Sequence, residues 1–247
     1  MSDIYLYQTL HLAAGRTVRN LEAHIAVLDG ASRRLFGRPY APGAEALARR
    51  IAALATEERL PTRVSGFVRL ELGPDGEERL SPAGVSLYAG YAFRSLTPSA
   101  AILNYDIPFS EAPTSVREAT ARWARHEAMR RGADIAVRCD RTGVLREGDN
   151  APLLCAADRV VRIAPGLASV ERQLATEAVR AAGLELREEP FGRDELPQLD
   201  ELFFVDHRGV TALSHCDGQP LMTLLAERVA EALEGLFAKK ERPFAKK

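Results

Sequence analysis

Lysine is almost missing from this sequence. The four lysines are Lys239, Lys240, Lys246 and Lys247, so residues 1–238 use arginine wherever a permanent side-chain cation is needed. Arginine stays protonated at any working pH, whereas an amine can lose its proton and attack a carbonyl carbon. The absence of lysine therefore excludes an amine nucleophile or a Schiff base from the body of the fold.

A strong net charge is absent too. The 33 basic and 34 acidic side chains leave a formal net charge of -1. Proteins that bind nucleic acid or anionic membranes usually carry a positive field. We therefore expect neither nucleic acid nor a membrane among the partners. Apolar residues make up 46% of the chain, which is ordinary for a folded protein with a real core.

Metal-ligand spacings and export signals are missing as well. Cys139, Cys155 and Cys216 show no CxxC or Cys/His pattern, so we expect no metal and predict reduced, mostly buried thiols. The first residues, "MSDIYLYQTL", lack the basic and apolar regions of a signal peptide, and no apolar run approaches bilayer length. These features predict a cytoplasmic protein.

What is present is a mixture of helical and strand patterns. Apolar residues recur at helical spacing in two early segments, and hairpin signals such as "GPDG" separate apolar strands. The patterns predict helices at about 20–35, 44–56, 115–131, 169–182 and 221–237. They predict strands at 4–12, 64–72, 85–93, 101–105, 135–139, 144–147, 153–156, 160–163, 184–188, 202–206 and 210–214.

This order predicts an α+β fold with two lobes. The segment "DIPFSEAPTS" has two prolines and no periodicity, so it is typical of a connection between lobes. We predict an N-terminal α+β lobe at 1–105, a linker at 106–113, a C-terminal lobe at 114–238 and a basic tail at 239–247.

The helix after the linker has an unusual face. Ala121, Ala124 and Ala128 form a stripe of small residues that permits close packing. Trp123 on the same helix is predicted to be a core residue rather than a ligand platform.

The stretch "TGVLREGDNAPLL", residues 142–154, places a carboxylate between two apolar strands. Glu147 either bonds to backbone amides of a turn or belongs to a site. Asp149 and Asn150 are typical turn residues.

Four segments in this order resemble the class IV aminotransferases, the fold-type IV family of pyridoxal-phosphate (PLP) enzymes. The family includes branched-chain and D-amino acid aminotransferases and aminodeoxychorismate lyase. The similar segments cover nearly the whole chain: "NLEAHIAVLDGASRRLFG", "RHEAMRRGADIAVRCDRTGVLREGDNAPLL", "AAGLELREEPFGRDELPQLDELFF" and "CDGQPL". The resemblance implies the two-lobed fold of this family and a homodimer.

The resemblance gives Glu147 a role, because the family's Glu-Gly carboxylate faces the pyridine nitrogen of PLP. The other cofactor contacts are replaced. The Schiff-base lysine should lie near Pro113 or Thr114, and the phosphate-binding arginine position holds Val27. The two phosphate-binding segments read "LASVER" (167–172) and "DHRG" (206–209), which puts Asp206 where a phosphate dianion would bind. We therefore expect no cofactor.

Several residues are candidates for the site that remains. His207 borders the altered phosphate segment and could exchange protons with Glu147 near neutral pH, unless it is only a turn or core histidine. Arg172, Arg208 and Arg138 are candidate ligands for a carboxylate, with Thr114 at the lysine position. Cys216 is predicted to be a buried thiol, since strand alternation puts His215 on the opposite face.

Three functions follow from these observations. The first is a divergent class IV protein that binds or transforms a small anionic metabolite in the inter-lobe cleft without PLP, using Glu147 and His207 as the titratable pair. The second is a working PLP-dependent aminotransferase or aminodeoxychorismate lyase-like enzyme with atypical cofactor binding. The third is a non-catalytic homodimeric scaffold.

Overall fold

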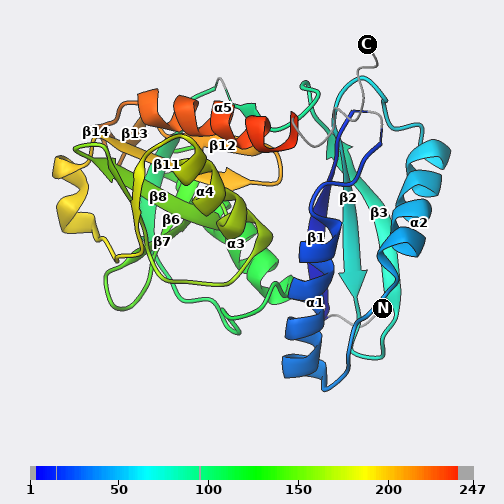
Figure 1. The fold of residues 1–247 in the computed structure, drawn as a ribbon. Coiled ribbons are helices and arrows are strands. Elements are labelled where there is room, and N and C mark those ends of the chain that lie inside the picture. Colours follow the sequence, from blue (N-terminus) through cyan, green and yellow to red (C-terminus); the bar gives the residue numbers. More distant parts are fainter. Residues whose placement is uncertain (1–3, 15, 95, 239–247) are drawn as a thin grey trace, which may run out of the picture. The chain divides into compact units, whose positions relative to one another are not determined.

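The computed structural model describes residues 4–14, 16–94 and 96–238 (Figure 1). The chain divides into two compact units. The first unit comprises residues 1–90, 107–120 and 167–170, and the second comprises 91–106, 121–166 and 171–247. The sequence predicted two lobes joined by a linker at 106–113, and the chain passes between these two units at several points. The predicted tail, 239–247, lies outside the described residues.

The first unit is a three-stranded antiparallel sheet with two helices. The strands lie in the order β1 (Leu6–Leu12), β2 (Gly66–Leu72) and β3 (Glu78–Val85), and the helices are α1 (Leu21–Phe36) and α2 (Ala44–Glu57). Apolar residues at helical spacing, among them Leu28, Leu47 and Ile51, are fully buried with Leu10 and Leu70 of the sheet. The predicted amphipathic helices therefore supply one side of this core.

The second unit contains an eleven-stranded mixed sheet. Its main path runs β14-β13-β5-β6-β7-β8-β11-β12-β4, and β9 pairs with β8 and β10. The strands are β4 (Ala92–Phe93), β5 (Ser99–Asn104), β6 (Ile135–Cys139), β7 (Leu145–Gly148), β8 (Ala151–Ala157), β9 (Val160–Ile163), β10 (Glu185–Arg187), β11 (Glu201–Asp206), β12 (Gly209–Ala212), β13 (His215–Cys216) and β14 (Gln219–Pro220). The helices are α3 (Ser115–Arg130), whose residues 115–120 belong to the first unit, α4 (Val170–Ala181), whose first residue also does, α5 (Leu224–Ala238) and the 3-10 helix η1 (Arg193–Gln198).

The small-residue face of α3 packs as the sequence predicted. Ala124 and Ala128 are completely buried against Ala101 and Leu103 of β5 and Ala136 of β6. The prediction for Trp123 was wrong, because this side chain is 63% exposed. The three alanines already bury their face, and Trp123 lies outside that stripe.

The predicted strand at 85–93 was also wrong. Residues 78–85 form β3, paired with β2 across the "GPDG" turn, and only Ala92–Phe93 of the later segment is a strand. Val85 and Leu87 are large apolar residues at the start of the predicted segment. These side chains are 55% and 89% exposed, so they do not pack in a core.

All three cysteines are buried free thiols, as predicted. Burial raises the pKa of Cys155 and of Cys216 to about 12. Cys216 lies in β13, where its neighbour His215 is exposed. A thiol with such a pKa is protonated near neutral pH and is a poor nucleophile.

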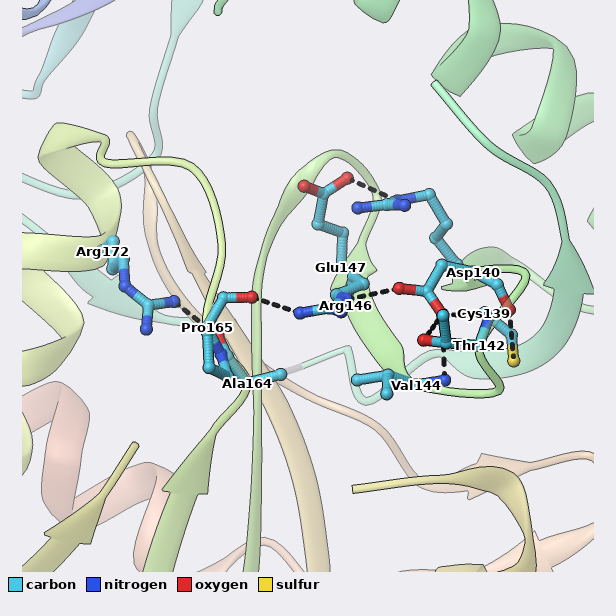
Figure 2. Close-up of polar contacts among 10 residues, drawn as sticks. Cys139, Asp140, Thr142, Val144, Arg146, Glu147, Ala164, Pro165 and Arg172 are labelled. Carbon is cyan, nitrogen blue, oxygen red and sulfur yellow. Dashed lines mark hydrogen bonds and ion pairs between the residues drawn. The ribbon is translucent and has the colours of Figure 1, made fainter. Parts of the chain in front are cut away.

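The β6–β7 hairpin is closed by Asp140 (Figure 2). Its Oδ1 atom accepts hydrogen bonds from Thr142 N at 2.9 Å and Val144 N at 3.1 Å, and its Oδ2 accepts one from Arg146 Nε at 2.7 Å. Burial alone would raise the pKa of Asp140, but the bonds from Thr142 and Arg146 lower it to about 2. The carboxylate therefore stabilises the folded hairpin in its charged form.

We predict that Asp140→Asn lowers the free energy of unfolding near pH 7 by about 2 kcal/mol, because one pKa unit corresponds to about 1.4 kcal/mol. A depressed pKa contributes stability above the unfolded value, here 3.8, and that contribution is lost as pH falls toward 2. The difference between wild type and variant should therefore shrink from pH 7 to pH 3 in urea titrations. Asp158→Asn, at an exposed turn, is the control. An equal loss in both variants would contradict a specific role.

We also predict that Cys155 and Cys216 resist Ellman's reagent at pH 8 until the protein unfolds. Their thiolate fraction is small because burial raises each pKa to about 12. Added denaturant should release all three thiols at the rate of unfolding. Rapid labelling of either cysteine in the native protein, mapped by mass spectrometry, would show that these thiols are accessible.

Candidate functional site

Glu147 and Arg138 form a buried ion pair on neighbouring strands. The antiparallel register of β6 and β7 places the two residues directly opposite each other. Arg138 Nε donates a hydrogen bond to Glu147 Oε2 at 3.1 Å, and each residue is 7% exposed. The partner that the structure places against the Glu-Gly carboxylate is therefore a guanidinium.

The Arg138 guanidinium has unused donors. Within the described residues its one hydrogen bond is the Nε bond to Glu147, which leaves the two terminal Nη groups as donors. Burial lowers the pKa of Arg138, while the nearby Tyr105 and Asp140 oppose this shift. Arginine remains charged nonetheless, so the site presents a partly desolvated cation.

Gly148, next to Glu147, leaves room for buried side chains of β8 and β11. A Cβ atom on residue 148 would lie 2.7 Å from Phe204 Cδ1 and 3.3 Å from Leu153 Cδ1. Both side chains are fully buried and cannot move away without opening the core. The glycine of the Glu-Gly pair is thus required by packing against β8 and β11.

The Asp206 carboxylate accepts hydrogen bonds from backbone amides of the β11–β12 turn. Its Oδ1 accepts hydrogen bonds from Arg208 N at 2.7 Å and Gly209 N at 3.2 Å. The turn is therefore closed by its own carboxylate. The donors that an external anion could have used here are already bonded.

His207 and Arg208 lie in this same turn. Burial lowers the pKa of His207, while Asp206 opposes the shift and Arg208 adds to it. His207 is therefore neutral near pH 7. The Arg208 side chain is exposed. The structure thus separates the candidates into two groups: Arg138 with Glu147 on the β6–β7 hairpin, and His207 with Arg208 on the β11–β12 turn.

Arg172 lies on α4 and is engaged at both ends of its guanidinium. One terminal nitrogen donates to Ala164 O at 2.7 Å (Figure 2). The other donates to Glu188 Oε1 at 2.8 Å. Its side chain is 14% exposed. These bonds tie the first turn of α4 to the segments that follow β9 and β10.

Thr114 lies just before α3 and is 1% exposed. Its Oγ1 accepts a hydrogen bond from Arg117 N at 3.2 Å, which is the contact of a helix N-cap. Val27, at the other replaced position, lies within α1. The hydroxyl at the predicted lysine position thus has a capping role.

Two arginines near the β11–β12 turn were not among the predicted site residues. Arg94 donates to Thr211 Oγ1 at 3.2 Å, and Arg125 of α3 pairs with Asp149. They come from segments far apart in the sequence, so no local motif announces them. The one available signal was a charged residue inside the alanine-rich part of α3.

Metal binding and membrane crossing are two further possibilities for the described residues. In the part of the chain that the structure describes, no group of three or more histidine, cysteine, aspartate or glutamate side chains could hold a metal ion. No helix among the same residues combines the length and apolar character needed to cross a membrane.

Solved structures similar to this chain include several aminotransferases. A fold IV-transaminase from Curtobacterium pusillum is 22% identical, with a TM-score of 0.75, covering 93% of this chain and 86% of the other. The branched-chain amino acid aminotransferase from Escherichia coli is 17% identical, with a TM-score of 0.79, covering 99% and 88%. The PLP-bound form of a hypothetical aminotransferase from Mycobacterium tuberculosis is 19% identical, with a TM-score of 0.78, covering 98% and 91%.

These likenesses confirm the predicted fold, an α+β fold of the fold-type IV class. No curated protein matches the sequence. The model of the family described as amino-transferase class IV matches residues 6–206, which is most of the chain. The protein therefore belongs to the class IV aminotransferase family.

Proposed function

We propose that this chain binds a small anionic metabolite at Arg138 and Glu147 and works without PLP. The observation that carries the proposal is the buried ion pair of these two residues, in which the guanidinium keeps two unused Nη groups. Buried arginines with a planar fork of donors suit carboxylate and phosphate ligands. The Glu-Gly carboxylate fixes the guanidinium, and the Nη groups bind the ligand.

The residues at the ring position do not fit PLP. A carboxylate beside the pyridine nitrogen would keep that ring protonated, but Glu147 already neutralises the positive charge of Arg138. Adding a pyridinium would put a second cation against one carboxylate in a desolvated place. The described residues also include no lysine that could form a Schiff base. At the position expected for that lysine, the Thr114 hydroxyl caps α3.

The residues at the phosphate position support the same reading. Asp206 already accepts hydrogen bonds from the turn amides, so a phosphate dianion there would meet a carboxylate in place of free N–H groups. Repulsion between the two anions would oppose binding. No step of a reaction is therefore assigned to PLP in this chain.

Any proton transfer at this site would use side chains alone. The neutral His207 of the β11–β12 turn is the proposed proton acceptor, and Glu147 of the β6–β7 hairpin is the proposed anionic group. Arg172, Arg208 and Thr114 stay secondary candidates as ligand contacts. We also propose that the protein is a cytoplasmic homodimer, as its family resemblance and its three unpaired cysteines suggest.

We predict that PLP at about 10 µM does not form a stoichiometric adduct with the protein after borohydride reduction. The body of the fold has no amine to form the imine. Intact-mass measurement with peptide mapping is the readout. A chain ending at Ala238 is the control, because it lacks every lysine and leaves the α-amino group as its one amine.

Sub-stoichiometric labelling confined to 239–247 or to the N-terminus would agree with the proposal. Equilibrium dialysis at the same concentration detects PLP held without a covalent bond. Saturable binding of one PLP per chain in either assay would overturn it and favour a working PLP enzyme.

We predict opposite effects of two substitutions at the ion pair on the binding of small carboxylates. Arg138→Gln removes the cation and should weaken binding about tenfold or more, since a charge-assisted hydrogen bond contributes about 1.5–3 kcal/mol. Glu147→Gln keeps the shape but removes the competing anion, so binding should stay equal or tighten. Thermal-shift titration with 2-oxo acids and dicarboxylates, 2-oxoglutarate included, is the measurement.

Arg180→Gln, at an exposed position of α4, is the matched control for the loss of one positive charge. Parallel weakening by Arg138→Gln and Arg180→Gln would show that only net charge matters. If no compound of the panel shifts the wild-type melting temperature, the scaffold reading is favoured over a ligand site.

A further inference from the structure

We propose that Arg146 is a positioning residue, which holds a β-bulge that turns Glu147 toward Arg138. The bulge lies in β7, beside the ion pair. Arg146 acts on a ligand only through Glu147 and Arg138, so its effect on ligand binding rests on the proposed function. Its effect on the ion pair itself can be measured without any ligand.

The residues of β6 alternate between two faces of the sheet. Val137 and Cys139 belong to the large apolar core of the second unit. Ala136, between them and Ile135, packs instead with the small-residue face of α3. Arg138 is two residues further along the strand than Ala136, so its side chain lies on the α3 face.

Regular alternation along β7 would put Glu147 on the other face. Leu145 belongs to the apolar core, and a residue two positions later in a regular strand shares its face. In the observed register, however, Cys139 is opposite Leu145 and Arg138 is opposite Glu147. One step on β6 thus matches two steps on β7, which leaves Arg146 as the extra residue of a bulge. Because directly opposite residues share a face, the bulge brings the carboxylate to the Arg138 side of the sheet.

The surroundings of Gly148 confirm this change of face. A Cβ atom at 148 would collide with Phe204 and Leu153, which both belong to the apolar core. Gly148 therefore faces that core, and Glu147 next to it faces the opposite side. Without the extra residue, the carboxylate would be directed at the same apolar side chains, where burying its charge would be costly.

Arg146 is bonded at two places that fix the bulge (Figure 2). Its Nε donates to Asp140 Oδ2 at 2.7 Å, and one terminal nitrogen donates to Pro165 O. Asp140 belongs to the turn of the β6–β7 hairpin, whereas Pro165 follows β9. The guanidinium therefore ties the extra residue of β7 to two separate segments of the second unit.

Electrostatic attraction to the ion pair does not explain an arginine at position 146. Burial is the main cause that lowers the pKa of Arg138, and the positive charge of Arg146 lowers it further. Two neighbouring guanidinium groups repel each other, and Asp140 offsets this repulsion. The geometry of the bulge, rather than the charge at 146, accounts for the two bonds that Arg146 makes.

The test is NMR spectroscopy of the full-length protein with isotope-labelled arginine. Arg138 Nε donates its proton to Glu147, so this proton should exchange slowly with water, and Arg138→Gln identifies its signal. Arg146→Gln should speed this exchange about tenfold, which is the effect of losing one ordinary hydrogen bond. Arg146→Lys keeps the charge and can reach one of the two acceptors, so it should restore part of the protection. It also serves as the second variant if Arg146→Gln does not fold.

Two controls separate positioning from charge and from stability. Arg141→Gln removes an exposed arginine of the same hairpin turn, and Val161→Ala destabilises β9 at a fully buried position. Both should leave the exchange of the Arg138 proton unchanged while the protein is folded. Equal acceleration by Arg146→Gln and by either control would overturn the inference. A wild-type proton that exchanges as fast as those of exposed arginines would overturn it too.

Binding of small carboxylates gives the second readout. Glu147→Gln leaves an acceptor for Arg138 Nε, but Arg146→Gln loosens that acceptor and should weaken binding about tenfold. Arg141→Gln should leave the affinity unchanged. Faster exchange in Arg146→Gln with no carboxylate binding by the wild type would defeat the proposed function but support the positioning of Glu147. Faster exchange with unchanged affinity would overturn the role in ligand binding, and unchanged exchange would overturn the inference altogether.

Discussion

The ion pair of Arg138 and Glu147 is the constraint that shapes this site. Burying two charges is costly, and removing one partner of a buried pair is worse, because it leaves a charge without compensation. The pair therefore holds both side chains in place. Its geometry depends on the β6–β7 hairpin, where the register shifts between Arg138 and Cys139 and where Asp140 closes the turn. Local turn chemistry thus positions the central charges of the second unit.

Under the proposed function, internal groups take the contacts that a cofactor makes in the family. Glu147 has a guanidinium as its partner, and Asp206 bonds the amides of the β11–β12 turn. The two carboxylates therefore have partners within the chain, while the Nη groups of Arg138 keep donors for a ligand. Membership of a family fixes the architecture, whereas the activity depends on the side chains placed on it.

Much of the fold could be predicted from periodicity and turn residues. The helices of the first unit and the β6–β7–β8 strands follow from apolar spacing, because each has one face in a core. The predictions for Trp123 and for a strand at 85–93 were wrong, because the apolar residues there are exposed and do not lie in a core. The sequence named Arg138 and Glu147 separately, but their pairing depends on strand register, which spacing alone does not fix. Arg94 and Arg125 meet only through tertiary structure.

An arginine-only fold also limits how this protein can respond to pH. A lysine in a desolvated place can lose its proton, but a guanidinium keeps its charge, so Glu147 keeps a charged partner at every working pH. The guanidinium of the pair therefore cannot act as a switch near neutrality. His207, whose pKa is lowered by burial, is the site residue that gains a positive charge once the pH falls below that lowered pKa. Its protonation would add a cation beside Arg208 and Arg94, so acid would strengthen the positive field at that turn while leaving the Arg138 site unchanged.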